Sequence, residues 1–192
     1  MHKTKRNKYL RRLTLGLLVF ITAMAQNVPW LPAIFGARGL PLIPLAVAIA
    51  VLEQEVPAIL FGTMAGLCWD FSGESLRGWH AIFLTAVAFL CAALMRYVLN
   101  RNALTVTLLS LAATALYLAA RWAYDALFIA PELAASSALL FYLPRLAYTM
   151  ALLPACYLLV RSVVRKTSRK QVGERIGEVE LGRIRLAGES LR

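Results

Sequence analysis

Charged residues are scarce in this chain of 192 residues, since Asp, Glu, Lys and Arg make up only 16% of it whereas hydrophobic residues make up 60%. Residues 103–120, for example, hold no charged side chain at all. A soluble domain of this size has too little interior to bury so much apolar sequence. The composition therefore predicts an all-α, polytopic transmembrane helical bundle that has the lipid bilayer as its solvent.

The sequence also lacks the patterns of common catalytic and metal sites. It has no P-loop, no G-x-S-x-G nucleophile turn, no H-E-x-x-H zinc motif and no paired acidic motifs of membrane phosphotransferases. His80 has no further ligand at suitable spacing, so a place at a helix start is favoured over a metal or acid–base role. An enzyme would need Asp70, His80 and Arg145 to converge, and we expect that they do not. We therefore expect no enzymatic activity, no metal and no cofactor.

The sequence has too few cysteines for a disulfide framework, and all of them lie in apolar surroundings. The three cysteines, Cys68, Cys91 and Cys156, are odd in number, and each lies within or at the end of an apolar run. A reactive thiol needs an electropositive and accessible setting, which these neighbours do not provide. We interpret the cysteines as small core residues.

The net charge of +11 is concentrated at the two ends of the chain. Six basic residues lie within residues 1–12, and five more lie within residues 161–170. Basic clusters that flank apolar runs are topology signals, so no nucleic-acid partner is expected. The sequence divides into a basic N-terminus at 1–12, a transmembrane bundle at 13–160 and a basic tail at 161–192, for which a solvated or loosely ordered segment is favoured.

Apolar runs predict about six membrane spans, namely residues 13–30, 40–52, 57–69, 79–99, 103–128 and 139–160. The second and third runs are shorter than a span of about 20 residues, so they are either short spans or a re-entrant hairpin covered by other helices. The first run contains a sequence similar to a signal-peptidase site, but we expect it to be kept as an anchor. With six spans, the N-terminus, Arg96, Arg101 and the C-terminal cluster fall on one side, which is predicted to be cytoplasmic.

Small residues mark one face of the segment that begins at Gly62. Gly62, Gly66 and Asp70 are spaced by four, so a helix places them on one face where a neighbouring backbone can approach closely. A segment rich in Gly and Ser, with Gly73 and Gly78, then turns the chain. We interpret these residues as candidates for helix packing or partner contact, with ordinary packing favoured. Asp70 either caps the turn or, at membrane depth, needs a partner.

A second group of candidates carries charge near the same membrane face. Arg121 and Asp125 lie four residues apart near one end of the fifth run, and Arg145 enters the sixth run from that side. An intramembrane ion-pair group is therefore predicted, with Asp70 emerging on the same side. A structural bridge between helices is favoured over a polar substrate or partner site.

The stretch from Gly62 to Leu90 resembles the MreD family of bacterial rod-shape-determining membrane proteins. Members of that family show a glycine-rich helix, an Asp, a Gly/Ser turn, and then a Gly followed by a small apolar helix. The corresponding residues in this sequence are Gly66, Asp70, Gly73, Gly78, Ala81, Leu84 and Ala88. The basic termini and the number of predicted spans are similar as well.

The resemblance implies a non-enzymatic subunit of the cell-elongation machinery, multi-pass in the plasma membrane of a bacterium, with both termini cytoplasmic. Its implied partner is MreC, with indirect links to MreB and to peptidoglycan synthases. The implied fold is similar to substrate-binding subunits of energy-coupling-factor vitamin transporters. That similarity defines an alternative function, in which Asp70, Arg121 and Arg145 contact a ligand. Few polar groups lie within the predicted membrane interior, so the sequence favours the scaffold.

Overall fold

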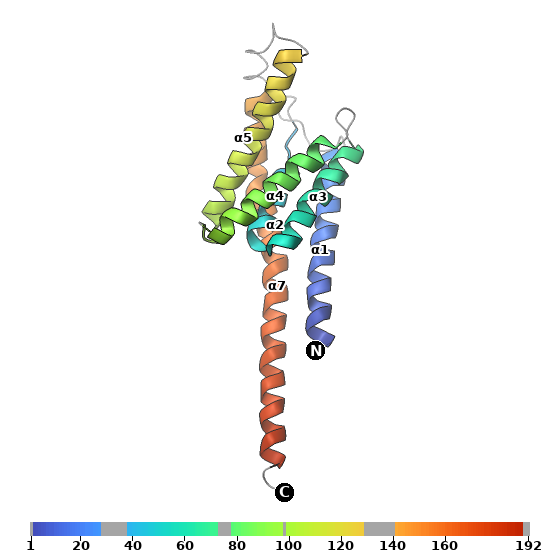
Figure 1. The fold of residues 1–192 in the computed structure, drawn as a ribbon, viewed down its shortest axis with the longest axis vertical. Helices are drawn as coiled ribbons and strands as arrows, with labels where there is room; N and C mark the ends of the chain where they lie inside the picture. The colour runs from blue at the N-terminus through green and yellow to red at the C-terminus, as the bar shows by residue number, and fades with distance from the viewer. Residues whose placement is uncertain (1, 28–37, 73–77, 98, 129–140, 190–192) are drawn as a thin grey trace.

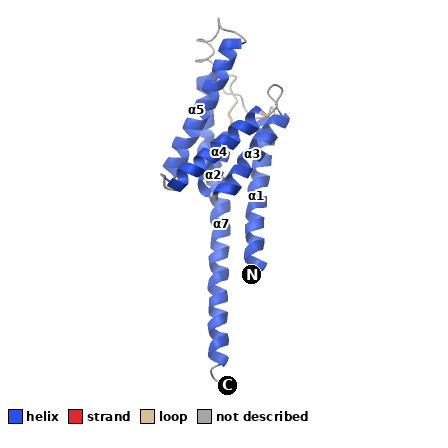
Figure 2. Ribbon diagram, in the orientation of Figure 1, coloured by secondary structure: helices blue, strands red, loops and turns tan. Residues whose placement is uncertain are grey.

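The computed structural model describes residues 2–27, 38–72, 78–97, 99–128 and 141–189 (Figure 1). These residues form helices and connecting loops, and no strand occurs among them (Figure 2). The helices are α1 (His2–Asn27), α2 (Leu42–Leu52), α3 (Glu55–Ser72), α4 (Trp79–Tyr97), α5 (Ala103–Phe128) and α7 (Leu143–Glu189). The prediction of an all-α chain is confirmed.

Within the part of the chain that the structure describes, three helices are long and apolar enough to cross a membrane. They are α4, α5 and the part of α7 from Leu143 to Thr167, with mean hydropathies of 1.7, 1.9 and 1.5. Large apolar side chains cover their outer faces, for instance Ile82 at 70% and Leu127 at 74% exposure. An apolar exterior of this extent is expected of helices that lie in lipid and not in water.

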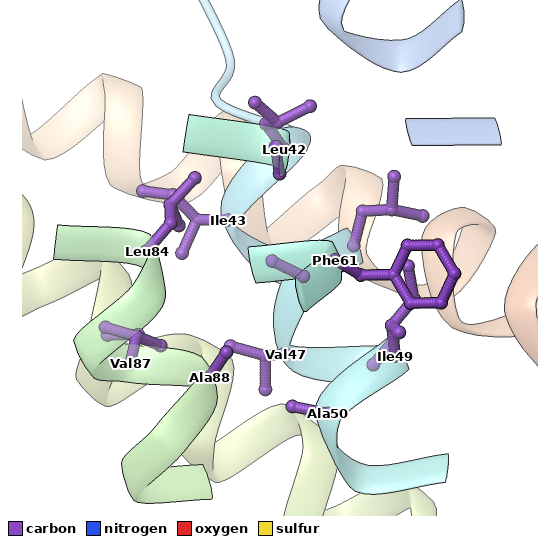
Figure 3. Packing of buried hydrophobic residues seen from close by; sticks show 14 of the residues in the cluster. Leu42, Ile43, Val47, Ile49, Ala50, Phe61, Leu84, Val87 and Ala88 are labelled. Carbon is purple, nitrogen blue, oxygen red and sulfur yellow. The ribbon is translucent and has the colours of Figure 1, made fainter. Parts of the chain in front are cut away.

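The shortest helix, α2, lies at the centre of the bundle. Its residues from Leu42 to Val51 are all buried, and it packs against α1, α3, α4, α5 and α7. Figure 3 shows Ile43 and Val47 of α2 beside Leu84 and Ala88 of α4. Eleven residues rise only about 16 Å, roughly half the thickness of the hydrocarbon layer. The short run at 40–52 is therefore a half-length helix that its neighbours enclose.

The chain enters α2 through buried, non-helical backbone whose polar groups are paired with side chains. The N–H of Leu40 donates to Thr149 Oγ1 over 3.0 Å, and the N–H of Leu42 donates to Gln26 Oε1 over 3.2 Å. Thr149 is fully buried and Gln26 is only 7% exposed. Non-helical backbone at membrane depth needs such partners, because lipid offers none.

Arginines hold the turn between α2 and α3 at one end of the bundle. Arg11 of α1 pairs with Glu53 at 2.6 Å, and Arg96 of α4 pairs with Glu55 at 3.1 Å. Arg101 reaches the carbonyl of the last residue of α2 at 3.5 Å. In Figure 1, α1 begins and α7 ends towards this side. We call it the basic end, and we call the opposite side, where α3 ends and α4 begins, the Asp70 end.

The Glu53 carboxylate is buried although it lies at the basic end. Its side chain is 0% exposed, and burial raises the pKa of Glu53 while the positive charges of Arg11 and Arg12 oppose that shift. Glu53 Oε1 and Arg11 Nε are both buried without a hydrogen-bond partner among the described residues. These two atoms are the ones that a bidentate pair would join, so the ion pair is one hydrogen bond short of that form.

Helix α7 continues far beyond the bundle at the basic end (Figure 1). It runs for 47 residues to Glu189, which corresponds to about 70 Å. The sequence favours a solvated or loosely ordered segment after residue 160, and the structure describes helical backbone in that segment up to Glu189. The alternation of basic, acidic and Gly residues conceals the helix because it leaves only a weak apolar periodicity.

Thr149→Val tests whether the pairing of the α2 entry stabilises the fold. The change keeps the shape of the side chain but leaves the buried N–H of Leu40 without an acceptor, which should lower the free energy of unfolding by about 1–3 kcal/mol. Thr107→Val is the matched control, because Thr107 Oγ1 also donates to the carbonyl four residues earlier but lies on the exposed face of α5. Equal denaturation curves in detergent for both variants would contradict the role of Thr149.

Candidate functional site

Two glycines allow α3 and α4 to pack at short distance. A Cβ atom on Gly62 would lie 2.5 Å from the Cβ of Ala88, and one on Gly66 would lie 2.3 Å from the Cα of Ala81. The hydroxyl groups of Thr63 and Thr85 form a 2.9 Å hydrogen bond across the same contact. The face predicted from the glycine spacing thus lies against α4 of the same chain.

Asp70, in the last turns of α3, caps the first turn of α4. Its Oδ2 accepts the N–H of Ala81 at 2.9 Å, and its Oδ1 accepts the N–H of His80 at 3.3 Å. A carboxylate in this place satisfies free N–H groups and is attracted by the positive end of the helix dipole. Gly78 precedes the helix with a φ of 92°, a left-handed conformation that favours glycine. Gly73 lies outside the described residues.

His80 joins three helices at the Asp70 end. Its Nδ1 lies 2.7 Å from Asp70 Oδ1, and its Nε2 lies 3.0 Å from the hydroxyl of Tyr117 on α5. The indole of Trp69 stacks on the imidazole, with 4.3 Å between ring centroids. The prediction that His80 lies at a helix start is confirmed, and Asp70 and Tyr117 are partners that the sequence spacing did not indicate. Asp70, His80, Tyr117 and Trp69 form what we call the Asp70 cluster.

The geometry of the Asp70 cluster places a proton on His80 Nδ1, because a carboxylate oxygen can only accept a hydrogen bond. With a neutral imidazole, Nδ1–H donates to Asp70 and the unprotonated Nε2 accepts the hydroxyl of Tyr117; with an imidazolium, both ring nitrogens donate. In either form both nitrogens already have protein partners, and the side chains of His80 and Asp70 are only 12% and 8% exposed. A general base must face its substrate, so this arrangement serves helix packing better than catalysis.

The second predicted group is divided in the structure. Arg121 Nε lies 3.4 Å from Asp125 Oδ2, and the same oxygen accepts a short hydrogen bond from the hydroxyl of Tyr142. Arg145 instead donates from Nε to the carbonyl of Arg38 at 3.0 Å, and no carboxylate among the described residues lies within ion-pair distance of it. Arg121 and Asp125 therefore form a pair, and Arg145 pairs with main chain.

Both groups nevertheless lie at the same end of the bundle. Tyr117 is within electrostatic range of Arg145, Arg121, Asp70 and Asp125. Of the three residues that an enzyme would bring together, Asp70 and His80 lie within hydrogen-bond distance, whereas Arg145 makes no described hydrogen bond to either. Tyr117 was missed because its hydroxyl lies alone in an uncharged run. The signal was nonetheless present, since a buried tyrosine hydroxyl usually needs a partner.

Two cavities lie at the ends of helices and not at the centre of the bundle. One of about 390 Å³ is lined by Trp79, Arg121 and apolar residues near the end of α5. The other, of about 360 Å³, lies at the basic end and is lined by Glu53, Glu55, Arg96, Arg101 and neighbouring residues. The centre is filled by α2, so neither cavity is formed by polar groups converging inside the membrane.

Comparisons with known proteins give no assignment: no family model, no curated protein and no solved structure matches the chain.

Gly66→Ala tests the short distance between α3 and α4. The new methyl group would meet the backbone of α4, so the free energy of unfolding should fall by about 1–3 kcal/mol. Gly16→Ala is the control, because its methyl group would lie 3.6 Å from the nearest side chain and should stabilise α1 by up to about 1 kcal/mol. Membrane insertion is expected for both variants. Equal denaturation temperatures would contradict the close contact.

Asp70→Asn tests the cap on α4. An amide has one acceptor oxygen in place of two, so one N–H in the first turn of α4 loses its acceptor, at a cost of about 1–3 kcal/mol. Hydrogen exchange at the amides of His80 and Ala81 should become faster. Glu55→Gln is the control, because that exposed carboxylate pairs with Arg96 at the surface. Unchanged exchange in Asp70→Asn would reduce Asp70 to an ordinary turn residue.

Proposed function

We propose that this chain is a non-enzymatic membrane scaffold subunit of the bacterial cell-elongation complex, which partners MreC and links peptidoglycan synthesis to the MreB cytoskeleton. The observation that carries the proposal is the role of the residues that resemble the MreD family. Gly66 allows α3 to pack directly against the backbone of α4, Asp70 caps α4, and Gly78 provides the turn before α4. A motif with these roles builds a rigid helical hairpin, as a scaffold requires.

The proposed topology has six passes, with both termini on the cytoplasmic side of the plasma membrane. Successive helices run in alternating directions through the bundle (Figure 1). Of the described arginines that are exposed, Arg12, Arg96, Arg101, Arg161 and Arg165 lie at the basic end, and Arg38 lies at the other end. The positive-inside rule assigns the end with the excess of basic residues to the cytoplasm. In this arrangement α2 is an enclosed half-length helix, and the fold is similar to that of energy-coupling-factor substrate-binding subunits.

The hairpin of α3 and α4 also offers an outer face to a partner helix. Leu60 on α3 is 65% exposed, and Ile82 and Phe89 on α4 are 70% and 55% exposed. Because the glycine face is used within the chain, a partner in the membrane would meet these larger side chains instead. We propose this outer face of the hairpin as the contact with MreC.

The alternative function as a vitamin-transporter subunit has less support. It needs Asp70, Arg121 and Arg145 as ligand contacts, but Asp70 already accepts two N–H groups and His80, and Arg121 already pairs with Asp125. Using these groups for a ligand would break contacts between helices. A buried carboxylate or guanidinium that loses its partner is costly, which weighs against a ligand at this place.

Photo-crosslinking in living bacterial cells, combined with pull-down from gently solubilised membranes, tests the function. A photoreactive residue at Leu60 or Ile82 should capture MreC, with wall-synthesis proteins recovered in the same pull-down. The same residue at Leu104 or Leu127 of α5 is the control, because these positions are as exposed but lie outside the hairpin.

Three results would count against this proposal in different ways. Capture of MreC from α5 alone would place the interface elsewhere, and absence of MreC from every position would refute the scaffold function. Recovery of an ATPase pair with a bound small molecule would support the transporter subunit.

A further inference from the structure

At the basic end, α1 and α7 each change from exposed apolar to exposed basic side chains. On α7, Leu158 and Leu159 are 59% and 50% exposed, and the exposed residues Arg161, Arg165 and Lys166 follow them. On α1, Leu13 and Leu17 are 69% and 53% exposed, and Arg12 is exposed just before them. The two helices pack against each other, so both transitions belong to one surface.

The positive charge on this surface is not compensated by the described acidic residues. Among the residues with described side chains, the basic end has two carboxylates, and these pair with Arg11 and Arg96. The same end has seven described arginine and lysine side chains. With the two glutamates, its net charge is therefore +5. The unpaired part of that charge is carried by Arg101, whose described contact is with a main-chain carbonyl, and by Arg12, Arg161, Arg165 and Lys166.

The arrangement along α7 places apolar and basic groups on one helix face. Leu158, Arg161 and Arg165 are three and four residues apart, so they follow one another along that face. The guanidinium of Arg161 lies 5.6 Å from the centroid of the Tyr157 ring. Long basic side chains beside a tyrosine are typical of the boundary between the hydrocarbon layer and the headgroups.

We infer that the exposed basic residues of α1 and α7 form a binding site for an anionic phospholipid of the leaflet at the basic end. The lipid phosphate is attracted by Arg12, Arg161 and Arg165, and its acyl chains lie along the exposed leucines of the same two helices. A soluble polyanion gains nothing from those leucines, whereas a phospholipid has both a charge and a chain to match them. This site is independent of the proposed scaffold function.

The test uses the purified full chain in a neutral detergent, with phosphatidylglycerol as the probe and phosphatidylcholine of the same acyl chains as its neutral counterpart. Lipid bound to the intact protein is counted by native mass spectrometry across a titration. Each removed charge should weaken binding of phosphatidylglycerol about fivefold, so Arg161→Gln with Arg165→Gln should weaken it about 25-fold. These side chains are exposed, so the variant should fold.

Arg96→Gln with Arg101→Gln is the matched control, because it removes the same charge from the same end but from outside α1 and α7. Weakening of less than fivefold in the control supports a site on α1 and α7. Equal weakening in both double variants would show a diffuse field and no site, which overturns the inference. Equal binding of phosphatidylcholine, displacement by inorganic phosphate at millimolar concentration, or preference for an oligonucleotide or an acidic peptide would each overturn it too.

Discussion

The constraint on which the rest of the structure depends is the enclosure of α2. Because α2 is half-length and ends at the basic end, it begins inside the bundle, where lipid cannot pair with its polar backbone groups. Gln26 and Thr149 provide acceptors at the start of α2, and Arg101 contacts the carbonyl at its end. Because these partners come from α1, α7 and the loop before α5, the pairing fixes the height of three segments around the core. The aliphatic side chains of α2 then complete the packing.

At the Asp70 end, the short distance between α3 and α4 likewise determines which segments are held together. Gly62 and Gly66 allow the two helices to touch, and the contact brings Asp70 over the free N–H groups of α4. His80 follows on α4, and its second ring nitrogen reaches Tyr117 on α5. One short helix contact thereby leads to a hydrogen-bonded chain across three helices. The residues of the motif that resembles MreD are explained by this chain without any chemistry of catalysis.

Local signals in the sequence predicted the helices, the small-residue face and the grouping of Arg96 and Arg101 with the N-terminus. Apolar run length and four-residue spacing act over neighbouring turns, so they can be recognised in a single sequence. The hydrogen bond between His80 and Tyr117 and the one between Leu40 and Thr149 join residues 37 and 109 positions apart. No spacing rule connects such residues, because the connection arises only after the helices have packed. The helical tail was missed for another reason, since its weak apolar pattern does not distinguish a solvated helix from a loose segment.

The two ends of the bundle use charge in different ways, and this difference bears on how a scaffold would work. At the Asp70 end, Asp70 accepts hydrogen bonds from α4, and Asp125 accepts one from Tyr142 besides pairing with Arg121 on its own helix, so these carboxylates connect separate segments of the chain. At the basic end, the basic side chains outnumber the carboxylates, and those of α1 and α7 that have no described carboxylate partner are exposed. Helix α7 leaves the bundle through that surface and continues from Thr167 to Glu189, which adds about 30 Å. On the proposed scaffold function, contacts with the core and with lipid headgroups would together orient this helix away from the membrane. The extension would then place a partner at a distance from the membrane that its length determines.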